Sequence, residues 1–332
     1  MTTMQDVAKR AGTSAAVVSY VLNNGPRPVS TATRQKVLDA VDELGYRING
    51  AGRTLRSRKS KIIGVVLPDS SHPFFADISR RIERATYELG YVVLIGNSLN
   101  DSDREKEYFD LFREHQVDGV LLTVDPGERI GDLVDAAIPV VLLDEPSPGL
   151  AISSVTVDNL DGAYQATRLL LAEGHESIGF IGGNAGLPSA DARERGWRAA
   201  VDDAGVPFHI ARRVEFTRDA GYRTGLEFLD SPHTPTAVFV SSDQQAIGLL
   251  RACAERGVRV PDDLSVIAFD DSDDARYTTP PLSTVRQPMS DIVTRALELL
   301  MDPPDAPVHE VFPHEIITRG STRTATAPSD DR

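Results

Sequence analysis

The stretch TMQDVAKRAGTSAAVVSYVL, Thr3–Leu22, contains two short helical patterns separated by a glycine. Thr3 can cap a first helix, because Asp6 stands three residues further on, and Gly12 ends that helix. Ser14 can cap a second helix whose valines and leucine recur at helical spacing. Two helices joined by a tight turn that contains glycine are typical of a helix-turn-helix DNA reader.

A third helical pattern follows the break at NNGPRP, residues 23–28. Ser30 can cap it, and Gly45 closes it. Its inner face is formed by Val37, Val41 and Leu44. The sequence therefore predicts an all-α DNA-binding domain over residues 1–47.

Charge is distributed unevenly along the 332-residue chain, whose formal net charge is −14. Residues 1–61 hold eleven Lys or Arg and four Asp or Glu, a net charge of +7, so the other 271 residues carry about −21. A small basic head on a large acidic body predicts a polyanionic partner for the head alone.

One cysteine, Cys253, excludes an internal disulfide framework and is typical of a reducing compartment. Its surroundings, LLRACAERG, indicate an amphipathic helix, so we expect a buried thiol. No apolar run approaches the roughly 18 residues of a membrane-spanning helix. AAVVSYVL could imitate a signal peptide, but polar residues interrupt it and no cleavage-site pattern follows. We therefore predict a cytoplasmic protein with no membrane partner.

From Lys61 on, short apolar runs alternate with longer amphipathic stretches. The runs predicted as strands are IIGVVLPD, YVVLIGNS, DGVLLTV, PVVLLDE, SSVTVDN, SIGFIGG, AVFVSSD and LSVIAFDD. Strands rich in Val, Ile and Leu that alternate with helices predict a parallel sheet covered on both faces. Because roughly 260 residues exceed what one such sheet needs, we expect two doubly wound α/β subdomains.

Together these segments resemble the LacI/GalR family of bacterial transcription regulators. The head, from MQDVAKRAGTSAAVVSYVLN to ELGYRIN, is similar to the family's D-V-A-x-x-A-G-V-S-x-x-T-V-S-x-V-L-N and E-L-G-Y-x-x-N. The body is similar at IGVVLPDSSHPFF, VDGVLL, GHESIGFIGG, RERGW, GVRVPDDLSVIAFDD and TTPPLSTVRQP. The resemblance covers essentially the whole chain. It implies a periplasmic-binding-protein-like body, hinged around a small ligand, in a homodimer or tetramer that binds pseudo-palindromic double-stranded operator DNA.

The resulting domain prediction has a DNA-binding domain at 1–47, a hinge at 48–60 and a ligand-binding and dimerisation domain at 61–323. Within the last, subdomain N takes about 61–160 plus 289–318, and subdomain C takes about 161–288. Residues 324–332, TATAPSDDR, are predicted as a disordered tail.

A recognition helix presents its first residues to base edges in the major groove. By the resemblance, Ala15, Ala16 and Tyr20 occupy base-reading positions, and Ser14 and Ser19 can bind phosphates. The alanines offer only methyl contacts, whereas Tyr20 can stack or donate a hydrogen bond; packing of Tyr20 in the head is the alternative. The full set predicted at the DNA is Thr3, Ser14, Ala15, Ala16, Ser19, Tyr20, Asn23, Arg53, Leu55 and Arg56.

The segment NGAGRTLRSRKS, residues 49–60, carries one large apolar residue, Leu55, among four cations. In the family this segment folds into a short helix on the operator, and a leucine from each subunit wedges between base steps. The resemblance gives Leu55 that role. Gly50 and Gly52 each cost about 1 kcal/mol in a helix relative to alanine. We therefore expect the hinge to be disordered in the free protein and to fold on DNA.

A small-molecule cleft is predicted between the subdomains, where such pockets usually form. HPFF follows the first strand of the body at its carboxyl end, so Phe74 can offer a flat face to a sugar ring or a base. The resemblance places Arg193 at the family's ligand-clamping arginine, whose planar fork can hold two hydroxyls. The predicted ligand-binding set is Phe74, Ser189, Arg193, Phe216, Asp243 and Asp270.

The two aspartates have a second interpretation. Asp243 and Asp270 both end apolar strands and can accept hydroxyl protons, but both also precede helical or turn sequence, where aspartate caps helices. Ligand contact is preferred for Asp270, and both interpretations stay open for Asp243. Asp158, in VDN, is instead expected to cap the helix that follows.

An arginine and aspartates with an aromatic platform suit a polyol, so a sugar or sugar phosphate is the preferred effector. A purine or nucleoside is the alternative, since ARYTTP and STVRQP also resemble the purine-type members. Leu187 stands where such a site would offer an arginine, which weighs against it. The predicted function is a ligand-responsive repressor, by preference of a carbohydrate-utilisation operon.

The sequence does not match the motifs of several other kinds of functional site. FDDSDDAR does not match a calcium loop, GGNAG lacks the Lys of a phosphate-binding loop, and neither zinc-type histidine spacing nor a nucleophile elbow occurs. We therefore predict no metal, no cofactor and no enzyme activity. A solute-binding protein without DNA function is an alternative that shares the body fold, and the basic head disfavours it.

Overall fold

The computed structural model describes residues 2–22, 27–46, 59–124, 126–143, 149–206 and 208–323. The chain divides into two units, one from Met1 to Ser60 and one from Lys61 to Arg332. The predicted DNA contacts Asn23, Arg53, Leu55 and Arg56, the glycines of the hinge and the tail 324–332 lie outside the described residues.

The first unit, the head, contains three helices within its described residues: α1 (Met4–Arg10), α2 (Ala15–Leu22) and α3 (Thr31–Glu43). Their caps confirm the sequence prediction. The Thr3 hydroxyl accepts from Asp6 N, and the Asp6 carboxylate accepts from Thr3 N at 2.8 Å. The Ser14 hydroxyl accepts from Val17 N at 3.4 Å, and Ser30 caps α3. The helices enclose a small aliphatic core of Val7, Ala8, Ala11, Val18, Val21, Val37 and Ala40.

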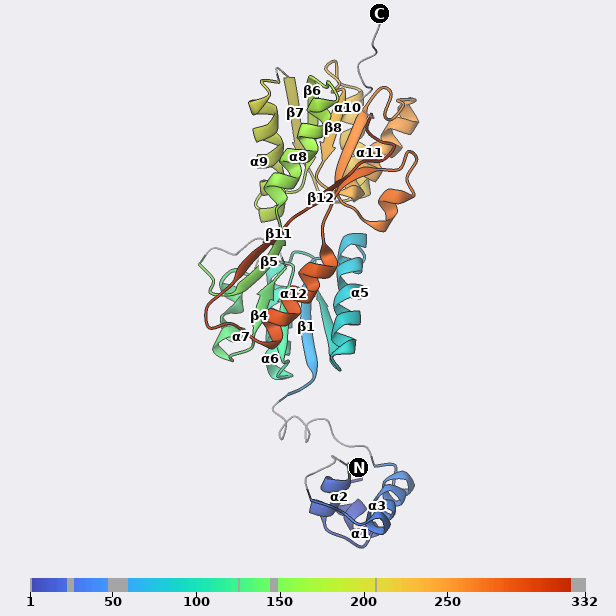
Figure 1. Ribbon diagram of the computed structural model, residues 1–332, viewed down its shortest axis with the longest axis vertical. Helices are drawn as coiled ribbons and strands as arrows, with labels where there is room; N and C mark the ends of the chain where they lie inside the picture. Colours follow the sequence, from blue (N-terminus) through green and yellow to red (C-terminus); the bar gives the residue numbers. More distant parts are fainter. Residues whose placement is uncertain are drawn as a thin grey trace, which may run out of the picture. The chain divides into compact units, whose positions relative to one another are not determined.

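The second unit, the body, is built on two six-stranded sheets of described residues (Figure 1). The first, in the order β11-β5-β4-β3-β1-β2, contains β1 (Ile62–Leu67), β2 (Val92–Asn97), β3 (Gly119–Leu122), β4 (Val140–Leu142), β5 (Ser153–Val157) and β11 (His309–Phe312). The second, in the order β12-β10-β9-β8-β6-β7, contains β6 (Ser177–Gly182), β7 (Phe208–Arg213), β8 (Ala237–Val240), β9 (Ser265–Asp270), β10 (Ser283–Arg286) and β12 (Glu315–Ile317). We call the parts built on them subdomain N and subdomain C.

Helices cover both faces of each sheet, which confirms the doubly wound prediction (Figure 1). In subdomain N, α5 (Pro73–Glu88) and α12 (Met289–Met301) cover one face, and α6 (Ser102–Glu114) and α7 (Gly131–Asp135) the other. In subdomain C, α8 (Asn159–Ala172) and α9 (Pro188–Asp203) cover one face, and α10 (Arg218–Leu229) and α11 (Asp243–Arg256) the other. Within the described ranges, every helix falls short of the length and apolarity that crossing a bilayer requires.

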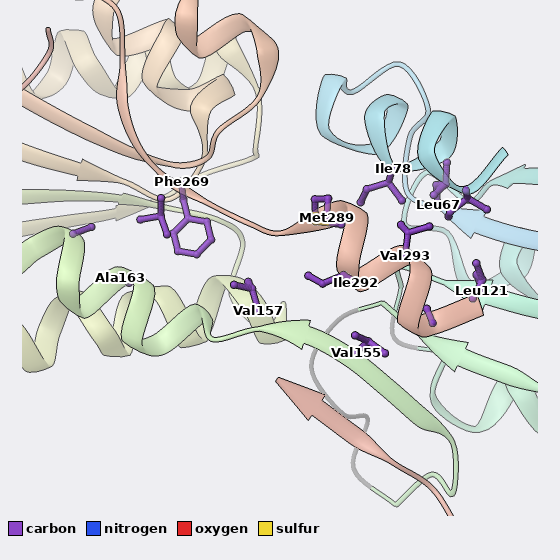
Figure 2. Close-up of a cluster of buried hydrophobic side chains, with 14 of the residues drawn as sticks. Leu67, Ile78, Leu121, Val155, Val157, Ala163, Phe269, Met289, Ile292 and Val293 are labelled. Carbon is purple, nitrogen blue, oxygen red and sulfur yellow. The ribbon is translucent and has the colours of Figure 1, made fainter. Parts of the chain in front are cut away.

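The largest cluster of buried apolar side chains spans both subdomains (Figure 2). On the subdomain N side, Ile292 of α12 packs in this cluster with Ile78 of α5 and Val155 of β5. On the subdomain C side, Ala163 and Phe269 belong to the same cluster. The shared core explains why the two sheets form one unit. The cysteine predicted to be buried, Cys253, lies 1% exposed in the other core of subdomain C.

Three crossovers join the sheets: between β5 and α8, between β10 and α12, and between β11 and β12. At the third, the chain returns to subdomain C, because β12 pairs antiparallel with β10 at Ile317 and Thr284. The predicted range 289–318 for subdomain N is therefore too long. The three residues of β12 are too few to show an alternating pattern, so the sequence could not assign them to the second sheet.

Candidate functional site

A cavity lies between the two sheets. Its walls come from the carboxyl ends of the parallel strands, where α/β sheets commonly bind ligands. Subdomain N contributes His72, Phe74, Phe75, Ile78, Thr123, Leu143, Val155, Thr156, Val157, Met289 and Ile292. Subdomain C contributes Ser189, Arg193, Phe216, Ser242, Asp270 and Gln287.

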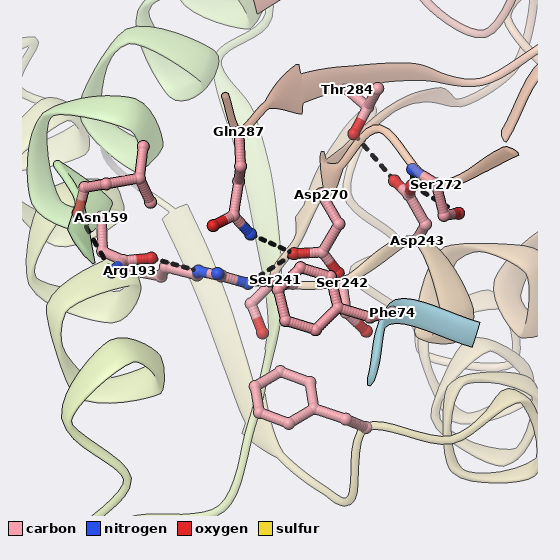
Figure 3. A network of polar contacts seen from close by, with 12 residues as sticks. Phe74, Asn159, Arg193, Ser241, Ser242, Asp243, Asp270, Ser272, Thr284 and Gln287 are labelled. Carbon is pink, nitrogen blue, oxygen red and sulfur yellow. Dashed lines mark hydrogen bonds and ion pairs between the residues drawn. The ribbon is translucent and has the colours of Figure 1, made fainter. Parts of the chain in front are cut away.

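The polar wall of the cavity is an ion pair between Arg193 of α9 and Asp270 at the end of β9 (Figure 3). Arg193 Nη1 lies 3.3 Å from Asp270 Oδ1, and both side chains are more than nine-tenths buried. Gln287 Nε2 also donates to Asp270 Oδ1, at 2.8 Å. The carboxylate thus receives two donors on one oxygen.

Arg193 is held in place from three sides. Its Nε donates to Asn159 Oδ1 at 2.9 Å, and its Nη1 donates to the Ser241 carbonyl at 2.6 Å. The guanidinium carbon lies 3.7 Å from the centre of the Phe269 ring, a cation–π distance. An arginine fixed in this way offers its fork to a ligand with little further loss of side-chain entropy.

The backbone at the end of β9 is strained. Asp270 has φ +121° and Asp271 has φ +52°, values that L residues rarely adopt and that cost on the order of 1–3 kcal/mol each. Such strain persists only where the surrounding structure enforces it, and it concentrates at functional sites. Burial raises the pKa of the Asp270 carboxyl, and the Arg193 guanidinium beside it opposes that rise.

Asp243 does not line the cavity, so its predicted ligand contact is wrong. Its side chain is fully buried behind the strand ends, where it accepts from Ser272 N at 2.6 Å and from the Thr284 hydroxyl at 2.7 Å (Figure 3). The alternative interpretation also fails, because Ser242 is the N-cap of α11. Burial, together with the nearby Asp270 carboxylate, raises the pKa of Asp243.

The aromatic side of the cavity starts at the N-terminus of α5. His72 caps this helix, since its Nδ1 accepts from Phe74 N at 3.3 Å. A neutral imidazole that accepts at Nδ1 carries its proton on Nε2. His72 Nε2 therefore donates to the Phe216 carbonyl, 3.0 Å away across the cleft. This hydrogen bond joins subdomain N directly to subdomain C.

Five of the six predicted ligand residues come together in the cavity: Phe74, Ser189, Arg193, Phe216 and Asp270. Sequence reasoning missed the polar residues His72, Thr123, Thr156, Ser242 and Gln287. Thr123, Ser242 and Gln287 each follow the end of a buried strand by one or two residues. Position after an apolar run was thus the signal that could have found them. Asp158 caps α8 as predicted, and its carboxylate accepts from Asp161 N at 2.8 Å.

In the head, the start of α2 forms an accessible surface. Ser14 and Ala16 are exposed, and Ala15 and Tyr20 are half-buried. Tyr20 is half-buried and is not a member of the head's hydrophobic cluster, and its contact with a base stays a prediction. Ser19 is only 5% exposed, so its hydroxyl has little surface for the phosphate that the sequence suggested. Thr3 is exposed at the N-terminus of α1.

Comparison with known proteins supports both units. Residues 3–49 match the bacterial regulatory proteins of the lacI family, and residues 167–322 match a periplasmic binding protein-like domain. The chain is 38% identical to the HTH-type transcriptional repressor CytR of Escherichia coli (strain K12), over 97% of this chain and 96% of that protein.

Two solved structures extend the likeness to three dimensions. The lac repressor dimer bound to operator and the anti-inducer ONPF is 27% identical, with a TM-score of 0.86 over 97% of this chain and 99% of that one. A LacI family transcriptional regulator from Enterococcus faecium with bound ribose is 29% identical, with a TM-score of 0.72 over 79% of this chain and 98% of that one. Sequence, fold and the order of the two units agree along nearly the whole length, and the chain belongs to the LacI family of bacterial transcription regulators.

Proposed function

We propose that the protein is a repressor whose affinity for a pseudo-palindromic operator is controlled by a neutral sugar bound in the cleft. The observation that carries this proposal is the Arg193–Asp270 pair, which faces the aromatic Phe74 across the cavity between the subdomains. Asp270 Oδ2 accepts no hydrogen bond from the described residues, so it is available to a ligand hydroxyl. A charge-assisted bond of this kind in a dry cleft is about twice as strong as a neutral one.

The charge of the cleft favours a neutral sugar over a sugar phosphate. Arg193 is the single Lys or Arg among the described lining residues, and Asp270 already balances it. A phosphate group would bring about two negative charges to a wall with no spare cation. The LacI family regulator from Enterococcus faecium described above has bound ribose, which supports a neutral sugar as the effector.

A nucleoside is the second candidate. The half of the cavity opposite Arg193 is apolar, with Phe75, Leu143, Met289 and Ile292 in its wall. A free sugar would leave much of this surface uncovered, whereas a base would cover it. In both cases the cleft binds the effector without transforming it.

Thermal unfolding of the full-length protein with D-ribose, D-glucose, ribose 5-phosphate, adenosine and cytidine tests the proposal. A ligand at 100-fold excess over its Kd should raise the Tm by roughly 5–10 °C. Asp270→Asn should lose at least about tenfold in affinity for that ligand, since a charge-assisted bond becomes neutral. Asp273→Asn, at an exposed position close by, is the matched control. Equal affinity of the two variants would refute the assigned role of Asp270.

For operator binding, we propose that the surface around Ala15, Ala16 and Tyr20 contacts the operator. The hinge residue Leu55 contacts it as well. A gel shift with DNA from upstream of the protein's own gene should show specific binding that weakens steeply with salt. Absence of specific binding with and without the ligands above would contradict the repressor assignment. A protein that binds the operator works beside the chromosome, so the proposal includes a cytoplasmic location.

We also propose that the protein acts as a homodimer through the β2 edge of subdomain N. β2 is an edge strand, and an uncovered apolar edge is a site of unwanted pairing unless a partner covers it. Val92 is 64% exposed there, and Leu99 just after the strand is 57% exposed. Tyr87 and Leu89, at the end of α5, are 74% and 52% exposed. A second copy of the chain would bury these side chains.

A further inference from the structure

The three crossovers between the subdomains lie toward one side of the two sheets. The strands at which they start or end are β5 and β11, at one end of the first sheet's strand order, and β10 and β12, at one end of the second. The opposite ends of the two orders are formed by β1 with β2 and by β6 with β7. In the described part of the chain no crossover starts or ends at those strands, so contacts between loops and side chains must hold the two walls together there.

One hydrogen bond spans the cleft at these opposite ends. His72 follows β1 by five residues, and Phe216 follows β7 by three. His72 Nε2 donates to the Phe216 carbonyl at 3.0 Å. Both residues line the cavity. The bond therefore joins subdomain N to subdomain C on the side of the cavity that faces away from the crossovers.

The donor of this bond is fixed within subdomain N. His72 is the N-cap of α5, and its Nδ1 accepts from Phe74 N at 3.3 Å. A neutral imidazole with its lone pair on Nδ1 carries its proton on Nε2, where the Phe216 carbonyl accepts it. The Phe75 ring packs beside the imidazole, with 5.4 Å between the ring centres. The helix cap thus sets both the position and the tautomer that the bond across the cleft needs.

The acceptor is fixed within subdomain C. Gln245, which is 0% exposed in α11, donates from Nε2 to the carbonyls of Val214 and Glu215 at 3.2 and 3.1 Å. The Phe216 ring lies over Gly183, where an added Cβ would be 2.2 Å from the Phe216 Cζ. The loop after β7 is therefore anchored from two directions, and its carbonyl stands at a defined place in the cleft.

We propose that His72 is a positioning residue of the effector response, because its bond to Phe216 is a latch that holds the cleft closed. Each partner is fixed in its own subdomain, so the bond forms at one separation of the two walls and breaks when they move apart about the crossovers. The proposal deepens the proposed function of the cleft and rests on it for its regulatory meaning. The mechanical part, closure of the cleft by the latch, requires no ligand.

The size of the expected effect follows from the net strength of one hydrogen bond. Loss of such a bond changes an equilibrium by roughly 2- to 10-fold. The closed arrangement brings both walls to the effector, so a lower closed fraction lowers the apparent affinity for the effector by up to the same factor. The latch would then tune effector affinity although it contributes no contact of its own to the Arg193–Asp270 pair.

Two substitutions of His72 separate the latch from the helix cap. In His72→Asn the amide oxygen takes the place of Nδ1, and asparagine is a preferred N-cap, but its side chain is too short to reach the Phe216 carbonyl. In His72→Gln the amide nitrogen extends about as far as Nε2 and can donate, whereas glutamine is not a preferred N-cap. His72→Asn thus keeps the cap and removes the latch, and His72→Gln does the reverse.

Distances between spin labels, measured by pulsed electron paramagnetic resonance on the full-length protein without ligand, report the state of the cleft. Glu107→Cys on α6 and Arg251→Cys on α11 place one label on each subdomain, at an exposed position and at one whose side chain is 70% exposed. Cys253 is 1% exposed, and burial raises its pKa to about 12, so it stays unlabelled. Dilution with unlabelled protein leaves only the distances within one chain.

His72→Asn should shift and broaden the label distance distribution while its Tm stays close to that of the wild type. His72→Gln should lower the Tm and keep the wild-type distribution. A role as helix cap alone predicts the reverse, since only His72→Gln would then alter the protein. A wild-type distribution for His72→Asn, or equal broadening in the two variants, overturns the latch. These measurements contain no ligand, so their outcome is separate from the thermal unfolding test of the proposed cleft function.

Discussion

At the end of helix α8, Glu173 and His175 bring two titratable side chains into the interior of subdomain C. Glu173 Oε2 and His175 Nε2 lie 3.9 Å apart, and neither has a hydrogen-bond partner among the described residues. His175 Nδ1 is within 3.0 Å of the Thr236 hydroxyl. Burial raises the pKa of Glu173 to about 7 and lowers the pKa of His175.

Glu173→Gln should make the protein more stable than the wild type at pH 8 but not at pH 5. A carboxyl whose pKa is raised in the folded state adds stability below its unfolded pKa of 4.5, and this stability disappears as the pH rises through about 7. Glutamine carries no charge at either pH, so the difference between the proteins should reach on the order of 2–3 kcal/mol. Calorimetric Tm values between pH 5 and 8 measure it.

The control for this prediction is Glu176→Gln, an exposed position three residues further on. Its Tm should follow that of the wild type at every pH. Parallel curves for Glu173→Gln and the wild type would show that the buried carboxyl does not ionise near neutrality. The lowered pKa of His175 acts in the opposite direction, since its stability contribution is lost as the pH falls below 6.5, and it is common to all three proteins to a first approximation.

Among the elements, α10 and α11 are packed backbone against backbone. A Cβ atom added at Gly248 would lie 2.0 Å from the Arg218 carbonyl oxygen, and one at Gly221 would lie 2.1 Å from the Gln245 carbonyl oxygen. Two glycines, one on each helix, therefore allow the close approach. The functional consequence is local, because Asp243, which supports the end of β9, begins α11.

Gly248→Ala should destabilise the body by about 1–3 kcal/mol or more, because rigid backbone on the facing helix cannot move aside. Gly131→Ala provides the comparison within α7, since no atom lies within 4 Å of its added Cβ. That variant should be neutral or more stable, by up to about 1 kcal/mol from helix propensity. Urea unfolding gives both values, and equal midpoints for the two variants would contradict the packing argument.

The elements that sequence could predict were those with a long apolar signal. All eight predicted strands are present, because runs of Val, Ile and Leu mark strands, and most of these strands are buried on both faces, the edge strand β2 being the exception. The four missed strands are β7, β10, β11 and β12. β11 and β12 have partly exposed, alternating or short patterns, and β10 has only four residues. Their place in the sheets depends on partners distant in sequence, which local periodicity does not report.

The same limit explains the error at Asp243. Sequence placed both Asp243 and Asp270 at strand ends, and that was right for both. Which of them faces the cavity depends on how the chain turns after each strand. After β8 two residues pass before α11 begins, and Ser242 rather than Asp243 reaches the cavity. Arg193 and Phe216 were found by resemblance and Phe74 by its position after the first strand of the body, and their mutual arrangement required the fold.

For the molecule as a whole, the proposed dimer predicts different outcomes at the two edges of the first sheet. Val92→Asp, on β2, places a charge where a second copy is proposed to pack, so the protein should become monomeric. Val311→Asp, on the opposite edge strand β11 and 55% exposed, should leave the dimer intact. Analytical ultracentrifugation separates these outcomes, and a dimeric Val92→Asp protein would place the interface elsewhere.

Leu55, outside the described residues, is proposed to wedge between base steps of the operator. Leu55→Ala should weaken specific operator binding without changing its salt dependence, because leucine contacts no phosphate. Arg56→Ala, one residue further on, should instead reduce the slope of affinity against salt by about one ion. Fluorescence anisotropy over a salt series distinguishes the two effects. Unchanged affinity of Leu55→Ala would exclude the wedge.

The return of the chain to the first sheet also sets the order in which the protein can be completed on the ribosome. β11 and α12 belong to the same subdomain as β5, yet β11 begins about 150 residues after β5 ends. At 5–20 residues per second, translation needs roughly 8–30 s to cover that interval. During this time the apolar face that α12 later covers, around Ile78, Leu121 and Val155, is open to solvent. We therefore expect early folding of the part of the second sheet that is made before β11, from β6 to β10, or chaperones, to protect the nascent chain from aggregation.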